Sequence, residues 1–287
     1  MWPKCPLFFT KMNGGEVSSK YGRFSNFWLI WFFIGLNTGL NKMEAQSIRE
    51  YEQLEKYYWW FVGRRHVIEK VLKRYFLGRQ LRILDWGCGP GGNFQFLEKY
   101  GQVLGVDASD EAIRACGEKG IQQVIKAGDL SEFKSDIKFD LITNFDVLEH
   151  IQEDDKFLLD LQKFLIPGGY VLVTVPAYQF LWSGLDELLG HKRRYTKKEI
   201  CQKFRRSGYE VFMASYFFFF LSPAFILYRM IQKIKKSNTT SLNQSVSKLP
   251  KIVNWLFTKI LSLEALIIPY LNLPFGTSII ILAKQKS

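Results

Sequence analysis

The chain has 287 residues, a formal net charge of +12, an isoelectric point near 9.4 and 16% aromatic residues. Its length allows one large domain, or one domain with an appendage, built on a full hydrophobic core. The four cysteines, Cys5, Cys88, Cys116 and Cys201, form no C-x-x-C pair, which argues against a disulfide framework or a zinc site and favours a reducing compartment.

The N-terminal region contains an apolar run at residues 27–36 that follows Lys20 and Arg23. This arrangement resembles a signal peptide, but the run is short for a bilayer span and no small-residue cleavage site follows it. We favour the interpretation that the folded protein begins near Met43 and that residues 1–42 are a poorly defined extension. An export signal or a membrane anchor is the alternative.

Apolar periodicity predicts a helix over residues 47–75, followed by alternating strands and helices. The predicted strands are 81–87, 102–109, 122–129, 139–147 and 169–177, and the predicted helices between them are 93–101, 110–120 and 153–165. This order indicates right-handed βαβ units in a doubly wound, parallel α/β sheet. A ligand is expected at the carboxyl ends of the strands.

The pattern changes after Pro176. A helix is expected over 197–208 and strands over 209–217 and 277–285, with two apolar and basic runs, 217–236 and 252–271, between these strands. An insertion of this length inside a sheet usually has a function of its own.

The first predicted strand runs into ILDWGCGPGGN, residues 83–93, in which Gly87, Gly89 and Gly92 match the G-x-G-x-x-G pattern of nucleotide-binding loops. Asp107, at the end of the second strand, can accept hydrogen bonds from a ribose in dinucleotide and nucleoside sites alike. Asp85 distinguishes the two, because a carboxylate suits the ammonium of a ligand better than a pyrophosphate. Asp129, after the third strand, can accept from an adenine amino group.

Five segments, LDWGCGPGG, VDAS, AGDL, FDVLEHI and LIPGGYVLVTVP, occur in this order and resemble those of class I S-adenosylmethionine-dependent methyltransferases of the type 11 and type 23 groups. The resemblance implies a Rossmann-like, seven-stranded α/β sheet whose last strand is antiparallel, with a helical insertion between the last two strands. It divides the chain into a core with an N-terminal helical lid (43–216), the insertion (217–274) and the final strand (275–287).

The same resemblance implies that S-adenosylmethionine is the cofactor. Gly87, Cys88 and Gly89 would contact its methionyl part. Asp107 and Ala108 would lie at the ribose, and Asp129 and Leu130 at the adenine. The remaining implied contacts are Asn144 and Phe145 near the sulfonium, Arg64 or Arg65 at the methionyl carboxylate, and Asp85.

Residues 177–199 follow the fifth strand and are expected over the mouth of the site. Tyr178, Trp182, Arg194 and Tyr195 are candidate acceptor contacts, and His191 or Asp186 is a candidate general base. The segment also resembles a bacterial subgroup suspected of acting on surface glycans or their lipid carriers. A solvated loop that covers the next helix is the alternative.

Asp146, Glu149 and His150 in FDVLEHI resemble a divalent metal site of quinone-biosynthesis O-methyltransferases, and His150 is a third candidate catalytic residue. Glu-His at this place also orders a turn in relatives without a metal. We therefore expect no metal site and keep a metal-dependent enzyme of the quinone type as the alternative.

Basic residues adjoin both apolar runs of the insertion, as expected of interfacial helices that meet anionic lipid headgroups. We expect peripheral membrane contact through residues 217–271 on the cytoplasmic face, with a helical cap or a dimer interface as the alternative. No nucleic-acid partner is expected, because no binding module is present. The predicted function is O-methylation of a lipid-linked, glycan or other amphipathic acceptor, and a non-catalytic cofactor-binding protein is the second alternative.

Overall fold

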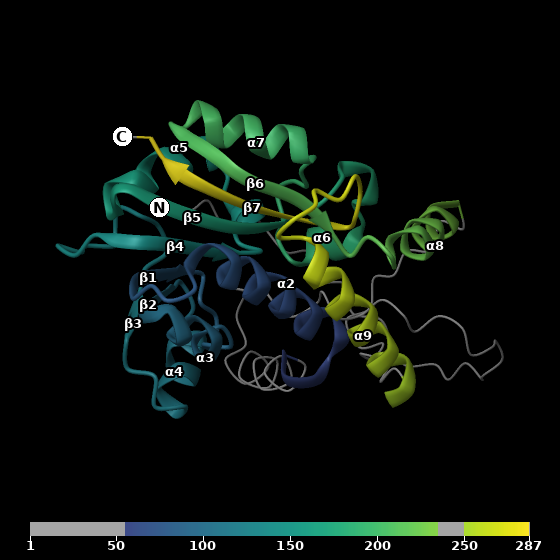
Figure 1. The fold of residues 1–287 in the computed structure, drawn as a ribbon, viewed down its shortest axis with the longest axis horizontal. Coiled ribbons are helices and arrows are strands. Elements are labelled where there is room, and N and C mark those ends of the chain that lie inside the picture. The colour runs from purple at the N-terminus through teal and green to yellow at the C-terminus, as the bar shows by residue number, and fades with distance from the viewer. Residues whose placement is uncertain (1–54, 235–249, 287) are drawn as a thin grey trace, which may run out of the picture.

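The computed structural model describes residues 55–234 and 250–286 as a central sheet with helices on both faces (Figure 1). The predicted extension at residues 1–42 lies outside the described residues, as do residues 235–249 of the predicted insertion. Among the helices that are described, none is both long enough and apolar enough to cross a bilayer.

The sheet has seven strands in the order β3-β2-β1-β4-β5-β7-β6. The strands β1 to β5 run parallel, and β7 runs antiparallel to both of its neighbours, β5 and β6. This arrangement confirms the predicted fold class. The strand bounds are β1 Leu81–Trp86, β2 Gly101–Asp107, β3 Val124–Lys126, β4 Phe139–Phe145, β5 Leu165–Pro176, β6 Tyr209–Phe217 and β7 Ser278–Gln285.

Successive strand residues bury their side chains on opposite faces of the sheet. Ile83 belongs to a core cluster that includes residues of α2 and α9, whereas its neighbour Leu84 belongs to a second cluster with residues of α5 and α7. The described α-helices are α2 Trp59–Phe76, α3 Phe94–Leu97, α4 Asp110–Glu118, α5 Asp154–Leu161, α6 Gly184–Leu188, α7 Lys197–Arg206, α8 Ser222–Ile234 and α9 Lys251–Ile267.

Strand β5 begins at Leu165, four residues before the predicted strand 169–177, and the helix predicted over residues 153–165 ends early. The helix α5 ends at Leu161, and a 3-10 turn at Gln162–Phe164 leads directly into the strand. The register of β5 against β4 shifts between Phe139 and Leu141, and Gly168 has φ +74°. A bulge of this kind lets a strand continue through a Pro-Gly-Gly sequence that reads as a turn.

Helix α9 of the insertion packs on α2, and the two helices lie next to each other in Figure 1. Their closest approach is at Gly63, where an added Cβ would stand 2.3 Å from Leu261 Cδ1. Asn254 accepts from the Trp59 backbone at 2.9 Å, and His66 Nδ1 lies 2.8 Å from Ser262 Oγ. The insertion thereby supports the helix that the sequence predicts to be the lid.

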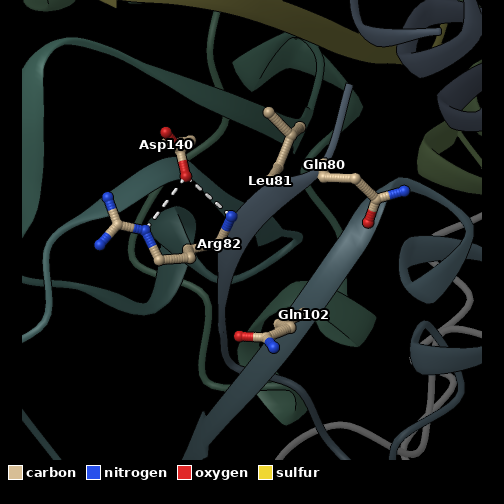
Figure 2. A pocket seen from close by; sticks show the side chains of 5 residues that line it. All are labelled: Gln80, Leu81, Arg82, Gln102 and Asp140. Atoms are coloured by element: carbon tan, nitrogen blue, oxygen red, sulfur yellow. Dashed lines mark hydrogen bonds and ion pairs between the residues drawn. The ribbon is translucent and has the colours of Figure 1, made fainter. Parts of the chain in front are cut away.

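A hollow of about 400 Å³ lies at the opposite edge of the sheet from the predicted ligand site (Figure 2). It is bordered by the starts of β1, β2 and β4, where Asp140 accepts from the backbone and side chain of Arg82 at 2.8 and 3.4 Å. Ligands of doubly wound sheets bind at the carboxyl ends of the strands, so this hollow is not the candidate site.

Candidate active site

The glycine loop connects the carboxyl end of β1 to α3. Gly87, Gly89 and Gly91 have φ values of +79°, +54° and +80°, in the region that favours glycine. A Cβ on Gly87 would stand 2.3 Å from Val147 Cγ2, whereas a Cβ on Gly89 would meet nothing within 4 Å. The loop is therefore closely packed below Gly87 and open beside Gly89, where a ligand can approach the backbone.

Asp107 and Asp85 fix this loop from the ends of their strands. Asp107 accepts from the backbone N–H groups of Gly89 and Ser109 at 2.8 and 2.9 Å. Asp85 is fully buried and accepts from Thr143 Oγ1 at 2.7 Å and Asn93 Nδ2 at 3.2 Å. Burial raises the pKa of both carboxyls, that of Asp85 to about 6. Two desolvated carboxylates next to an open loop favour a cationic or hydroxyl-bearing ligand.

Arg64 reaches this edge from α2 and forms a buried ion pair with Asp146, the residue after β4. Its charge also acts on Asp85, opposing the effect of burial on the pKa of that carboxyl. The guanidinium lies 5.2 Å from the centroid of the Trp60 ring. Arg64 therefore has Asp146 as a protein partner that the sequence did not reveal, and its contact with the methionyl carboxylate stays a prediction.

The other predicted cofactor contacts lie along the same edge. Asn144 and Phe145 are buried at the end of β4, and Ala108 is exposed after β2. Asp129 is exposed after β3 and accepts from the Ser131 hydroxyl and backbone, which hold the pKa of its carboxyl below the usual range. The two remaining residues are Leu130, which is half-buried, and Cys88, which is buried.

The chain that precedes α2 covers the glycine loop. A Cβ on Gly92 would stand 2.2 Å from Glu55 Oε2, and Arg65 donates to the Glu55 carbonyl oxygen. The Glu55 side chain therefore lies against the backbone of Gly92, 37 residues further along the chain. This placement agrees with a lid role for α2, which stays a prediction.

Asp186, in the short helix α6, and His191, just after it, form a buried pair in the segment that follows β5. Asp186 Oδ1 is 2.9 Å from His191 Nδ1 and 2.7 Å from Arg194 Nε. Burial would raise the pKa of Asp186, but the hydrogen bond of His191 and the charge of Arg194 outweigh it and hold that pKa well below the usual range. Asp186 therefore stays ionised and orients the imidazole. It is not itself suited to accept a proton at neutral pH.

Two predicted acceptor contacts are placed differently from the expectation. Arg194 donates to Asp186 and to the Ala177 carbonyl oxygen and is buried. Tyr195 is 2% exposed, and its hydroxyl lies 2.9 Å from Asp154 Oδ2. Both side chains brace the loop from inside, because a buried polar group needs a protein partner. We therefore leave them out of the acceptor pocket.

An aromatic wall that the sequence only partly revealed stands at the same edge. Tyr178, directly after β5, stacks on Tyr216 of β6 at a ring distance of 5.1 Å and contacts Phe180 at 5.2 Å. Tyr178 has φ +60°, a strained value for an aromatic residue. Trp182 is half-buried and donates to Glu187 at 3.3 Å. Sequence reasoning missed Tyr216, because β6 was read only as a structural strand.

Glu149 and His150 follow β4 in a short 3-10 turn and are close to His191. Burial, and after it the nearby Asp146, raises the pKa of Glu149 well above the usual range. Burial, and then the charge of His191, lowers the pKa of His150 to about 3. The structure therefore holds both groups in an environment that disfavours their charged forms.

Comparison with known families agrees with this geometry. Residues 61–213, more than half of the chain, match the family model described as a methyltransferase domain. The chain belongs to the methyltransferase-domain family. The matched segment contains every predicted cofactor residue and the Asp186–His191 pair, and its fold is that of the class I S-adenosylmethionine-dependent group.

Relatives of this methyltransferase-domain chain carry different names. An S-adenosylmethionine-dependent methyltransferase of Mycolicibacterium smegmatis is 28% identical over 55% of the chain. A phosphoethanolamine N-methyltransferase of Zea mays is 30% identical over 60%, and a ubiquinone biosynthesis O-methyltransferase of Maricaulis maris is 31% identical over 41%. The matches span 61%, 37% and 51% of these relatives' own lengths, respectively.

Two solved structures share the fold of this chain. Phosphoethanolamine N-methyltransferase 2 of Haemonchus contortus, in complex with S-adenosyl-L-methionine, has a TM-score of 0.54 and 19% identity, with coverage of 85% of this chain and 57% of that one. A chain from a complex with the Haloferax volcanii Trm112 methyltransferase activator has a TM-score of 0.54 and 16% identity, with coverage of 85% and 96%.

The cofactor of this domain is S-adenosylmethionine, and the site fits it in three respects. The Gly89 backbone is open to a ligand. Asn144 Oδ1 and Asp146 Oδ1 are buried without a hydrogen-bond partner, so acceptors are in place near the end of β4. Asp85 and Asp107 provide carboxylates of the kind that an ammonium and ribose hydroxyls require.

Proposed function

We propose that this protein transfers the methyl group of S-adenosylmethionine to an oxygen of an amphipathic, glycan or lipid-linked acceptor at the cytoplasmic face of a membrane. The observation that carries the proposal is the position of the aromatic wall. Tyr178 and Tyr216 stand at the ends of β5 and β6, on the same sheet edge as the open glycine loop. Tyr216 is buried, so an acceptor would stack on the half-buried Tyr178, beside the cofactor edge.

When bound, S-adenosylmethionine supplies an activated methyl group on a sulfonium. The protein then has to place the acceptor in line with that group and to exclude water, and placement alone is worth roughly 7–11 kcal/mol. Asp85, Asp107 and Arg64 would position the donor. The segment with Glu55 and α2 would cover it, because it already lies over the glycine loop.

Transfer to a hydroxyl also requires the removal of a proton. When no metal ion is bound, His191 is suited to accept this proton. Its Nδ1 faces the carboxylate of Asp186, so its Nε2 is the nitrogen that acts as the base. His150 is less suited, since its pKa is lowered to about 3. We propose that His191 is the base and Asp186 the positioning residue.

Membrane contact is proposed for the outer face of α9. Its exposed side chains recur at helical spacing and are almost all large and apolar, with exposures between 47 and 74%. We call this surface the α9 stripe, and its apolar members are Ile252, Trp255, Leu256, Leu263 and Leu266. A stripe of this composition on a helix that does not span a bilayer is typical of an interfacial helix.

The charges of α9 fit an anionic lipid surface. Lys251 and Lys259 are exposed at the stripe. Glu264, the acidic residue of the helix, is buried and accepts from the Phe220 backbone at 3.2 Å. The exposed face is therefore apolar and basic without an acidic group. Anionic headgroups would meet the two ammonium groups while the apolar side chains enter the acyl boundary.

The α9 stripe gives a direct prediction for vesicle binding. We expect the full chain to float with vesicles that contain anionic lipid, and to do so less as salt rises. The double variant Trp255→Glu, Leu263→Glu should bind at least roughly tenfold more weakly, because burying one such side chain is worth about 1.5–3 kcal/mol. Ile137→Glu is a matched control, since Ile137 is 55% exposed but precedes β4. A stripe that instead forms a dimer without lipid would contradict the proposal.

The acceptor class is tested by methyl transfer. Incubation with [methyl-³H]S-adenosylmethionine and fractionated lipids or glycans should label an amphipathic product with base-stable, ether-type chemistry. Label on an amine would contradict O-methylation and would favour N-methylation, the reaction in the name of the Zea mays relative. If the chain binds the cofactor and no fraction accepts label, the protein is a non-catalytic cofactor-binding protein instead.

A further inference from the structure

Glu149, His150 and His191 bring one ligand atom each to within 4.8 Å of one another. Two of these residues lie in the turn after β4, and the third lies in the loop after β5. The backbone N–H of Lys192 donates to the Glu149 carbonyl oxygen at 2.7 Å and ties the two loops together. The His150 and His191 rings are 4.7 Å apart, edge to face.

Three buried atoms of Glu149 and His150 lack hydrogen-bond partners. Both carboxylate oxygens of Glu149 and the Nε2 atom of His150 are buried and unpaired, and Glu149 is 0% exposed. The neighbouring His191 Nε2 lies 4.0 Å from Glu149 Oε1. Burying a carboxyl group without a hydrogen-bond partner costs folding free energy. The position of the Glu149 carboxyl next to two imidazoles therefore indicates a ligand that binds all three groups.

The outer atoms of both imidazoles are already held. His191 Nδ1 lies 2.9 Å from Asp186 Oδ1, and Asp186 is fixed in turn by Arg194 and by the Ser183 backbone. The His150 ring is hydrogen-bonded to the backbone of Gly190, and its Nε2 is not. In each ring, one nitrogen is held by a carboxylate or a backbone group and the other nitrogen faces the cluster. Histidine ligands of metals are oriented in this way.

We propose that Glu149, His150 and His191 bind a divalent transition-metal ion through two imidazole nitrogens and one carboxylate. Two nitrogens and one oxygen suit zinc or iron(II) better than magnesium or calcium, and they leave coordination positions open. Metal bonds of roughly 2.0–2.2 Å require the three atoms to close in by on the order of 1 Å. Rotation of the Glu149 side chain supplies part of this movement.

This ligand set differs from the one that the sequence suggested. Asp146 does not take part, because its Oδ2 forms the buried ion pair with Arg64. Its place is taken by His191, 41 residues beyond His150 in the chain. An ion held here would occupy His191 Nε2, so in the metal-loaded protein that atom is a ligand and does not accept the acceptor's proton. The inference concerns binding alone and does not rest on the proposed methyl transfer.

The test uses the full chain after dialysis against chelator, without cofactor or acceptor. Titration with Co²⁺ should give d–d absorption that saturates at about one ion per chain, and Zn²⁺ should displace it. Glu149→Gln and His191→Ala should abolish saturable binding, and Asp186→Asn should weaken it about 10- to 100-fold. His66→Ala is the matched control, because His66 is the one histidine of the sequence outside this cluster and pairs with Ser262 on α9.

A second measurement covers a variant that folds poorly. Zn²⁺ should raise the melting temperature of the wild-type chain and of His66→Ala, because a ligand that binds only the folded state stabilises it. It should not raise that of Glu149→Gln, which keeps the volume of the side chain. The proposal is wrong if the wild-type chain shows no saturable Co²⁺ binding, if the variants bind as it does, or if the spectrum reports cysteine ligation.

Discussion

Replacing Asp107 with alanine should weaken S-adenosylmethionine binding about 10- to 100-fold. The variant would lack the carboxylate that accepts hydrogen bonds from the ribose, and hydrogen bonds to charged groups are worth about 1.5–3 kcal/mol. The variant would also leave the backbone N–H groups of Gly89 and Ser109 without their acceptor, because both now donate to the Asp107 carboxylate, at 2.8 and 2.9 Å. Both losses act in the same direction, because an unrestrained glycine loop has to be ordered again when the ligand binds.

Isothermal titration of the variant with S-adenosylmethionine and with S-adenosylhomocysteine measures this effect. Asp110→Ala is the matched control, since Asp110 lies three residues further on, carries an exposed carboxylate and pairs with Lys126 on the surface. Its affinity should stay within about twofold of the wild-type value, as exposed pairs contribute little. Wild-type affinity in Asp107→Ala would show that the ribose is not bound at the end of β2.

The sheet could be predicted from the sequence because each parallel strand is a short apolar run that ends in a polar or glycine residue. Residues such as Ile83 and Leu84 are buried on opposite faces, so the run carries the strand signal without alternation. The cofactor residues followed from the same logic, because the carboxyl ends of neighbouring parallel strands share one edge. Asp85 and Asp107 lie at that edge as expected.

The arrangement of the loops could not be predicted in this way. Nothing in the sequence shows that the loop after β5 folds back on the turn after β4, so the meeting of His191 with Glu149 and His150 was not foreseen. Charged residues of that loop were expected to face an acceptor, whereas Arg194 is buried against Asp186. An arginine in a buried ion pair and an arginine that faces a ligand look the same in the sequence, and only tertiary contacts distinguish them.

Replacing Asp85 with asparagine should stabilise the fold at neutral pH while it weakens cofactor binding. Burial raises the pKa of the Asp85 carboxyl from 3.8 to about 6, a difference that corresponds to about 3 kcal/mol at 1.36 kcal/mol per pKa unit. Asparagine removes that cost without leaving a gap. Its oxygen can accept from Asn93, and Thr143 can accept from its amide while donating to the Leu84 carbonyl oxygen at 3.4 Å.

The sign of the pH dependence follows from the raised pKa. Between about pH 4 and pH 6 the folded chain keeps a proton on Asp85 that the unfolded chain has released, so the free energy of unfolding falls as pH rises through this window. Above about pH 6 the full cost is present, and below about pH 4 it is absent. The advantage of Asp85→Asn over the wild type should therefore be largest at pH 7–8 and disappear toward pH 4.

Urea unfolding of both proteins at several pH values measures this difference, and titration with S-adenosylmethionine gives the accompanying loss of affinity. Asp136→Asn, at an exposed carboxylate before β4, should change neither quantity with pH. Equal destabilisation of Asp85→Asn at every pH would mean that the hydrogen bonds of Asp85 contribute more to stability than the desolvation of its charge costs. A gain in stability joined to a loss of binding would instead mean that the ionised carboxylate is retained for the cofactor, at a cost to the fold.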